Sequence, residues 1–182
     1  RIIEWRIVKL VYGDKGTMMR ILLSVLVAAA CSVAVVLGHA RFLEPPSRAS
    51  AWRFGFDTPV NWNDNELFCG GLGNQMRHDG KCGVCGDPYQ GPRRHEAGGK
   101  YATGTIVRQY KAGSQMEVFV QMTTNHLGWH QWRLCPHNDV NTPAKKECFD
   151  KYLLERADGQ GTRYNVKSQM EKNITLSLRL PR

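Results

Sequence analysis

The stretch M-E-V-F-V-Q-M (Met116–Met122) decides the fold class, because its side chains alternate between apolar and polar types. The even-numbered positions carry methionine or valine, whereas Glu117 and Gln121 occupy odd-numbered positions. Successive side chains of a β-strand point to opposite faces of the sheet. The alternation therefore predicts a strand with one face in an apolar core and the other toward solvent.

Three further segments are predicted to be strands. Tyr101–Tyr110 is rich in β-forming residues, Trp129–Leu134 contains two aromatic residues and a leucine, and Ile174–Leu180 carries an aliphatic side chain at every second position. A turn is expected over 111–114, where the sequence reads K-A-G-S. Short strands separated by turns, without a long amphipathic helix, indicate an all-β antiparallel sandwich.

Residues 40–99 are predicted to form loops, because they are rich in Gly, Pro, Asn and Asp and show no helical period. The aromatic residues of Trp52–Asn65 and the turn residues of Gly80–Tyr89 indicate an ordered segment held by disulfides. Residues 39–182 as a whole are long enough for one domain with its own core.

The residues before His39 have the pattern of a secretory signal over 18–38. An apolar run, Ile21–Leu37, is followed by the small residue Gly38, after which we expect cleavage. A transmembrane anchor is the alternative, since the run is about long enough to span a bilayer. Residues 1–17 are predicted to be upstream translated sequence outside the fold. The expected product is a secreted, extracellular protein with no membrane contact after cleavage.

Five cysteines follow the predicted cleavage site, and secretion makes disulfides their expected state. The candidates are Cys69, Cys82, Cys85, Cys135 and Cys148. The C-x2-C spacing of Cys82 and Cys85 is also that of half a zinc site, although no second such pair follows. Because five is an odd number, at least one cysteine lacks a partner in this chain. The chain also stops directly after a predicted strand, so we expect a domain that is incomplete at its C-terminus.

The net positive charge of the chain does not indicate a nucleic-acid-binding protein. The chain has 25 Lys and Arg residues against 16 Asp and Glu residues. Its basic residues are scattered and form neither a stripe nor a nucleic-acid-binding motif, so no nucleic-acid partner is expected. Asn173 begins an N-I-T sequon and is a glycosylation candidate that fits secretion. We expect a monomer.

Cleavage after Gly38 would change the chemistry of His39. An N-terminal histidine offers a metal both its α-amine and its Nδ1, and nitrogen ligands of this kind suit copper. Such a site needs a second histidine, and His126 stands out at the end of the Met116–Met122 strand, in T-T-N-H-L-G-W-H. From the spacing alone, a structural histidine hydrogen-bonded at a strand end is the better-supported interpretation of His126.

The other histidines and three of the tryptophans are expected to have structural or solvated roles. Solvated or structural roles are expected for His78, His95 and His137, which lie in loop-like stretches, and a packing or hydrogen-bonding role for His130. Core packing is expected for three aromatic residues, although sugar stacking is the alternative. These are Trp52, Trp62 and Trp129.

Seven stretches of residues 39–182 are similar to the sequence motifs of one protein family and follow each other in the same order. They are H-A-R-F-L-E-P-P-S-R-A-S-A-W-R-F-G-F (His39–Phe56), L-F-C-G-G (Leu67–Gly71), G-K-C-G-V-C-G-D-P-Y (Gly80–Tyr89), H-E-A-G-G-K-Y-A-T-G (His95–Gly104), T-T-N-H-L-G (Thr123–Gly128), L-C-P (Leu134–Pro136) and E-C-F-D (Glu147–Asp150). Together they resemble the lytic polysaccharide monooxygenases, and most of all auxiliary activity family 15, which occurs in insects and other invertebrates.

This resemblance implies an immunoglobulin-like β-sandwich with long disulfide-pinned loops and a copper-dependent enzyme. His39 would bind one copper ion through its α-amine and Nδ1, and His126 through a ring nitrogen, as a histidine brace that makes both residues catalytic. The family cleaves crystalline chitin or cellulose oxidatively, typically at C1, using an external electron donor and O2 or H2O2. The implied partners are therefore a polysaccharide surface, with chitin ahead of cellulose, and an electron donor.

The chain departs from the family pattern at three places. Thr124 stands two residues before His126, where the family often has alanine, and His130 and Gln131 stand where an aromatic residue and a glutamate are expected. The family has an axial aromatic residue near its C-terminus, and no residue of this chain, Tyr164 included, matches it. These departures leave an alternative function, a secreted chitin-binding or copper-binding protein without catalytic turnover.

Overall fold

The computed structural model describes residues 39–137 and 139–182 of the chain. The upstream segment predicted over 1–17 and the secretory signal predicted over 18–38 lie outside the described residues. Within the described part of the chain, no helix is both long enough and apolar enough to cross a lipid bilayer.

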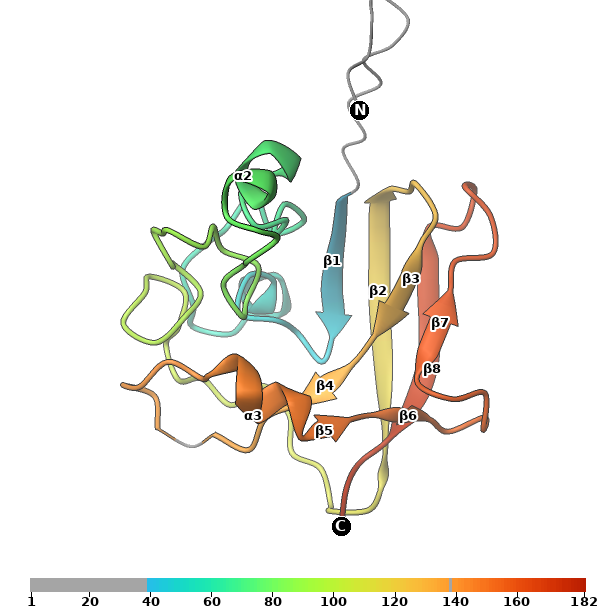
Figure 1. Ribbon diagram of the computed structural model, residues 1–182. Helices are drawn as coiled ribbons and strands as arrows, with labels where there is room; N and C mark the ends of the chain where they lie inside the picture. Colours follow the sequence, from blue (N-terminus) through green and yellow to red (C-terminus); the bar gives the residue numbers. More distant parts are fainter. Residues whose placement is uncertain (1–38, 138) are drawn as a thin grey trace, which may run out of the picture. The chain divides into compact units, whose positions relative to one another are not determined.

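The main sheet contains four antiparallel strands (Figure 1). Their order is β1 (His39–Glu44), β2 (Gln115–Thr124), β8 (Asn173–Arg179) and β6 (Glu155–Arg156). The ten-residue β2 is central, because it pairs with β1 on one side and with β8 on the other. This pairing places the first residues of β1 beside the last residues of β2.

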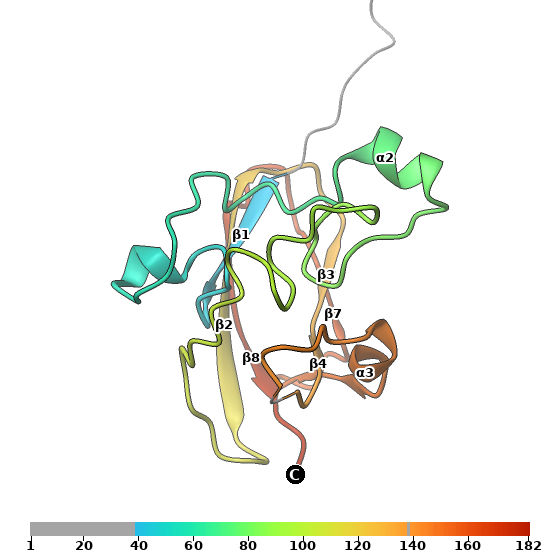
Figure 2. The same ribbon diagram turned by 90° about the vertical axis from the view of Figure 1, so that its left-hand side faces the viewer.

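Two short antiparallel pairs pack against this sheet. β3 (Trp129–Gln131) pairs with β7 (Arg163–Asn165), and β4 (Arg133–Leu134) pairs with β5 (Tyr152–Leu153). Figure 2 shows β2 and β8 to one side of β3 and β7. The buried side chains between the layers form two clusters: Val120, Met122, Tyr164, Val166 and Ile174, and Val118, Leu154 and Leu178. The predicted antiparallel β-sandwich is confirmed.

The period-two patterns explain how these strands build the core. Met116–Met122 lies within β2, in which Val118, Val120 and Met122 are buried while Glu117 is exposed. Ile174–Leu180 coincides closely with β8, and Ile174 and Leu178 are almost fully buried. Burying one such aliphatic side chain stabilises the fold by about 1.5–3 kcal/mol. Trp129–Leu134 is also confirmed as strand, with a break between β3 and β4.

Two of the secondary-structure predictions are wrong. Tyr101–Tyr110 forms no strand: the segment is irregular, Gly104 has a φ of +77°, and Arg108 makes an ion pair with Glu44 at 2.7 Å. Its β-forming residues find no strand to pair with, so propensity alone does not make a strand there. The loop prediction for 40–99 missed β1, which has two register irregularities and no alternation of buried and exposed side chains.

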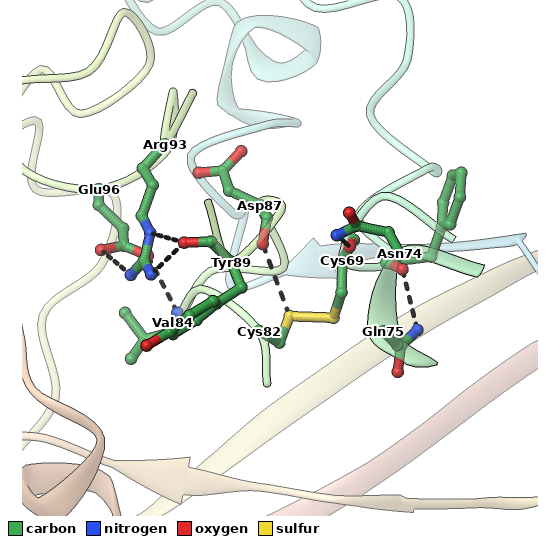
Figure 3. The surroundings of a disulfide bond; sticks show 10 residues. Cys69, Asn74, Gln75, Cys82, Val84, Asp87, Tyr89, Arg93 and Glu96 are labelled. Carbon is green, nitrogen blue, oxygen red and sulfur yellow. Dashed lines mark hydrogen bonds and ion pairs between the residues drawn. A yellow bond between two sulfur atoms is a disulfide. The ribbon is translucent and has the colours of Figure 1, made fainter. Parts of the chain in front are cut away.

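The remaining part of residues 45–99 is loop, with short helices η1 (Ala51–Phe54) and α2 (Leu72–Arg77), and lies on the β1 side of the main sheet in Figure 1. A third short helix, α3 (Lys146–Asp150), precedes β5. Figure 3 shows the Cys69–Cys82 disulfide, which joins the segment before α2 to the segment after it. The Asn74 side-chain amide donates to the Cys69 carbonyl at 2.7 Å and holds the same segment.

The disulfides settle most of the predictions for the cysteines. Cys69 pairs with Cys82, and Cys135 pairs with Cys148. The zinc interpretation of C-x2-C is wrong, because Cys82 is consumed in a disulfide. Cys85, a disulfide candidate, carries a free thiol instead, which agrees with the expectation that at least one of the five cysteines lacks a partner. Burial raises the pKa of that thiol.

A buried carboxylate ties the loops to the sheet. Asp64 is 2% exposed and accepts hydrogen bonds from the guanidinium groups of Arg41 on β1, at 3.1 Å, and Arg53 on η1. A buried carboxylate needs such partners, because desolvation of an unpaired charge is costly. This cluster therefore fixes the loop that precedes Cys69 against the first strand.

Candidate metal centre

The register of β1 and β2 brings the two candidate histidines to one place. His39, the first residue of β1, lies opposite Thr124, the last residue of β2. His126 follows two residues later, so both histidines stand at the same end of the sheet. They line one hollow of about 260 Å³, together with Phe68 and Trp129.

The His39 ring is held on two sides by the loop that follows Asp64. Its side chain is only 16% exposed. The Phe68 ring meets it edge-on, with ring centroids 6.0 Å apart and an angle of 71° between the planes. The Glu66 carboxylate lies 3.5 Å from His39 Nε2. The Nε2 side of the imidazole therefore faces an acidic group.

His126 sits in a tight turn that is tied to the segment before β8. The Asn125 side-chain amide donates to the carbonyls of Ser168, at 2.9 Å, and Glu171, at 2.6 Å, while its oxygen accepts from the Leu127 N–H at 2.7 Å. Leu127 and Gly128 both have positive φ, 66° and 98°, so the chain bends directly after His126. The turn is rigidly anchored, yet His126 itself is exposed.

Comparison with known proteins shows which family this chain belongs to. Residues 39–182 match the family described as "Lytic polysaccharide mono-oxygenase, cellulose-degrading". The chain belongs to the lytic polysaccharide monooxygenases. The predicted resemblance is thus confirmed, and with it a copper-dependent monooxygenase on an immunoglobulin-like β-sandwich.

A solved structure narrows the type of monooxygenase. The chain is similar to "Lytic Polysaccharide Monooxygenase AA15 from Thermobia domestica in the Cu(I) State", with 41% sequence identity and a TM-score of 0.76. The match covers 79% of this chain and 75% of that chain. No curated protein matches the chain. The monooxygenase is therefore of the auxiliary activity family 15 type.

The imidazoles of His39 and His126 line this hollow and are nitrogen donors that would fit a copper ion. His39 contributes a covered imidazole and His126 an exposed one to the same hollow. Among residues 39–137 and 139–182, no group of three or more His, Cys, Asp or Glu side chains is arranged to hold a metal. Two imidazoles would be enough for a histidine brace, which would take its third nitrogen from an α-amine. Nitrogen-rich sites suit copper.

His130 also lines the hollow of the monooxygenase, but it packs inward. Its ring stacks on Trp132, with centroids 6.1 Å apart, and burial lowers its pKa. It lies opposite Tyr164 in the β3–β7 pair. These contacts agree with the packing role expected for His130.

Tyr164 belongs to the core beneath this site. It is 8% exposed, and its hydroxyl donates to Glu171 Oε1 at 2.5 Å. Burial, and then the hydrogen bond to the Glu171 carboxylate, raise the pKa of Tyr164 to about 12. The same hydrogen bond lowers the pKa of Glu171.

The three remaining histidines lie outside the hollow. His95 is buried, with Nδ1 2.9 Å from Asp87 Oδ1 and Nε2 3.1 Å from the Asn61 amide, as a structural histidine should be. His78 lies near the Tyr89 ring, and exposed His137 donates to a backbone carbonyl at 2.6 Å.

Two tryptophans are misassigned by the sequence, and two site neighbours are missed. Trp62 is 76% exposed and Trp129 is 52% exposed, so the core role expected for both is wrong. Arg163 lies over the Trp129 ring at 4.2 Å and steadies it at the rim of the hollow. Glu66 and Phe68 were not predicted as site residues, because their contacts with His39 depend on the path of the loop and no local sequence pattern marks them.

Proposed function

We propose that the chain is secreted, is cleaved after Gly38 and then cleaves chitin oxidatively at C1, with cellulose as the alternative substrate. His39 binds one copper ion through its α-amine and Nδ1, and His126 binds it through a ring nitrogen. The observation that carries this proposal is the strand register, which sets His39 opposite Thr124 and so beside His126.

The bound copper supplies one-electron chemistry with O2 or H2O2 once an external donor has reduced it. The protein's own residues set up that chemistry. The covered His39 ring is fixed by packing, so its position costs little reorganisation when the metal binds. The exposed His126 and the exposed Leu127 stand at the surface, where a polysaccharide chain would arrive.

Secretion from a eukaryotic host that expresses the full chain tests this proposal. The purified protein should begin at His39 and release C1-oxidised oligosaccharides from crystalline chitin when copper, ascorbate and O2 or H2O2 are present. Oxidised products from cellulose alone would move the substrate assignment to cellulose. Unoxidised chain ends, or no products from either polysaccharide, would contradict the proposed activity.

Two further features of the secreted protein belong to the same proposal. Asn173, exposed at the first position of β8, carries an N-linked glycan, and the protein acts as a monomer on the polysaccharide surface. A glycosidase-sensitive mass excess on the peptide that contains Asn173, and a single-subunit mass in light scattering, are the expected results.

Thr124 favours the alternative function, a copper-binding or chitin-binding protein without turnover. This exposed residue lines the hollow beside both histidines, where the family often has the smaller alanine. The two functions differ in a Thr124→Ala variant. Unchanged copper binding with a gain of oxidised products from zero would support the alternative, whereas products from the unmodified protein would exclude it.

A further inference from the structure

We propose that Glu66 is a positioning residue for the copper-binding ring of His39. Its carboxylate lies beside Nε2 and favours the tautomer that carries the proton on that nitrogen, so that Nδ1 is the nitrogen offered to the metal. The inference rests on the proposed role of His39 and adds a residue that does not itself touch copper.

The contact is specific to one side of the imidazole. Glu66 Oε1 lies 3.5 Å from His39 Nε2, and the Phe68 ring meets the imidazole edge-on. The histidine side chain is 16% exposed, whereas that of Glu66 is 43% exposed. The carboxylate therefore keeps contact with water while it lies beside Nε2 of a mostly covered ring.

The backbone around Glu66 is fixed, so the carboxylate stays beside His39. On its N-terminal side, the Asn65 carbonyl accepts from the Ala40 N–H at 3.2 Å, and the Asn65 side-chain amide donates to Thr123 Oγ1 at 2.8 Å. These bonds attach the residue before Glu66 to both β1 and β2. The Glu66 N–H itself donates to the Asn63 carbonyl at 3.2 Å.

The C-terminal side is held by the disulfide region shown in Figure 3. The Gln75 side-chain amide donates to the Phe68 carbonyl at 3.2 Å. Cys69 is bonded to Cys82, and its N–H donates to the Gly86 carbonyl at 2.8 Å. The segment from Asn65 to Cys69 is thus anchored at both ends, with Glu66 and Phe68 presented to His39 between the anchors.

The chemistry of a neutral imidazole gives this contact its consequence. Only one of its two ring nitrogens carries a proton, and the other is free to bind a metal. A carboxylate next to Nε2 favours the tautomer with the proton on Nε2, which leaves Nδ1 as the unprotonated nitrogen. Loss of such an outer partner commonly lowers metal affinity by about 10–100-fold.

Two variants of the secreted protein and one matched control test the role of Glu66. Glu66→Ala removes both the charge and the acceptor, whereas Glu66→Gln keeps an acceptor oxygen without the charge. Glu117→Gln removes an exposed carboxylate from β2, beyond the part of that strand that pairs with β1. In Glu117→Gln, the His39 tautomer and the copper affinity should equal those of the unmodified protein.

The first readout needs no metal. Nitrogen-15 NMR of the copper-free protein at mildly alkaline pH should show His39 with its proton on Nε2. We expect a mixture of tautomers in Glu66→Ala and a smaller change in Glu66→Gln. The second readout is Cu(II) affinity, which should fall about 10–100-fold in Glu66→Ala and less in Glu66→Gln.

The two readouts separate the failure of this inference from the failure of the proposed function. If the unmodified protein binds no copper, the proposed function fails, but the tautomer comparison still decides the role of Glu66. An unchanged His39 tautomer in Glu66→Ala, or an unchanged copper affinity in a protein that does bind copper, would overturn the inference. If Glu66→Ala fails to fold, the same comparisons are made with Glu66→Gln.

Discussion

Asp64→Asn should destabilise the domain strongly, because Asp64 is the buried anion that Arg41 and Arg53 share. Removing one partner of a buried ion pair costs about 3–5 kcal/mol. The side chains of Arg41 and Arg53 are 18% and 31% exposed, so both regain some hydration when the charge is lost. The loss should therefore lie at the lower end of this range, and we expect the free energy of unfolding to fall by about 3 kcal/mol.

Equilibrium unfolding in urea measures this change. With an m-value of about 2 kcal/mol/M, the loss moves the midpoint down by about 1.5 M. Asp79→Asn is the control, because Asp79 is an exposed carboxylate that pairs with the exposed Lys81 at 3.8 Å. Its midpoint should stay at that of the unmodified protein. A midpoint for Asp64→Asn that moves no further than the control would refute the view that Asp64 ties the loops to β1.

Three other perturbations address the metal centre, the core and the titration of a buried phenol. His126→Ala should abolish tight copper binding in a calorimetric titration while the thermal midpoint stays unchanged, since His126 is exposed; retained tight binding would exclude it as a ligand. Leu178→Ala removes a fully buried side chain from the core and should lower the free energy of unfolding by about 3 kcal/mol in urea melts, and a loss below 1 kcal/mol would be inconsistent with that burial. The pKa of Tyr164 is raised to about 12, so its contribution to stability is fully present below about pH 10 and is lost as the pH rises through 12. Tyr164→Phe should therefore unfold with a shallower dependence on pH over that range, and identical alkaline melting curves for the two proteins would disprove the assignment.

The sequence predicts the parts of the sandwich whose side chains alternate. β2 and β8 each bury one face and expose the other, so their period-two patterns identify them correctly. β1 was not predicted, because all six of its residues are partly buried and its register is irregular, so its side chains show no alternation. Tyr101–Tyr110 fails for the opposite reason: it has strand-forming residues but no neighbouring strand to pair with.

For the candidate metal centre, the sequence predicts only the two proposed ligands. The motifs around His39 and His126 single out both residues, but only the register between β1 and β2 explains why they meet. Glu66 and Phe68 reach His39 through a loop whose path depends on Asp64 and on the Cys69–Cys82 disulfide. No local pattern encodes such contacts between distant segments. The same holds for the exposure of Trp129, the first residue of β3.

The central claim is that His39 becomes an N-terminal residue and forms one copper site with His126. Mass spectrometric sequencing of the N-terminus of the secreted protein, followed by copper titration of the same material, tests it most directly. The account predicts a chain that begins His39-Ala40-Arg41 and binds one copper ion tightly. A chain that begins at another residue, or a correctly cleaved chain that binds no copper, would contradict it.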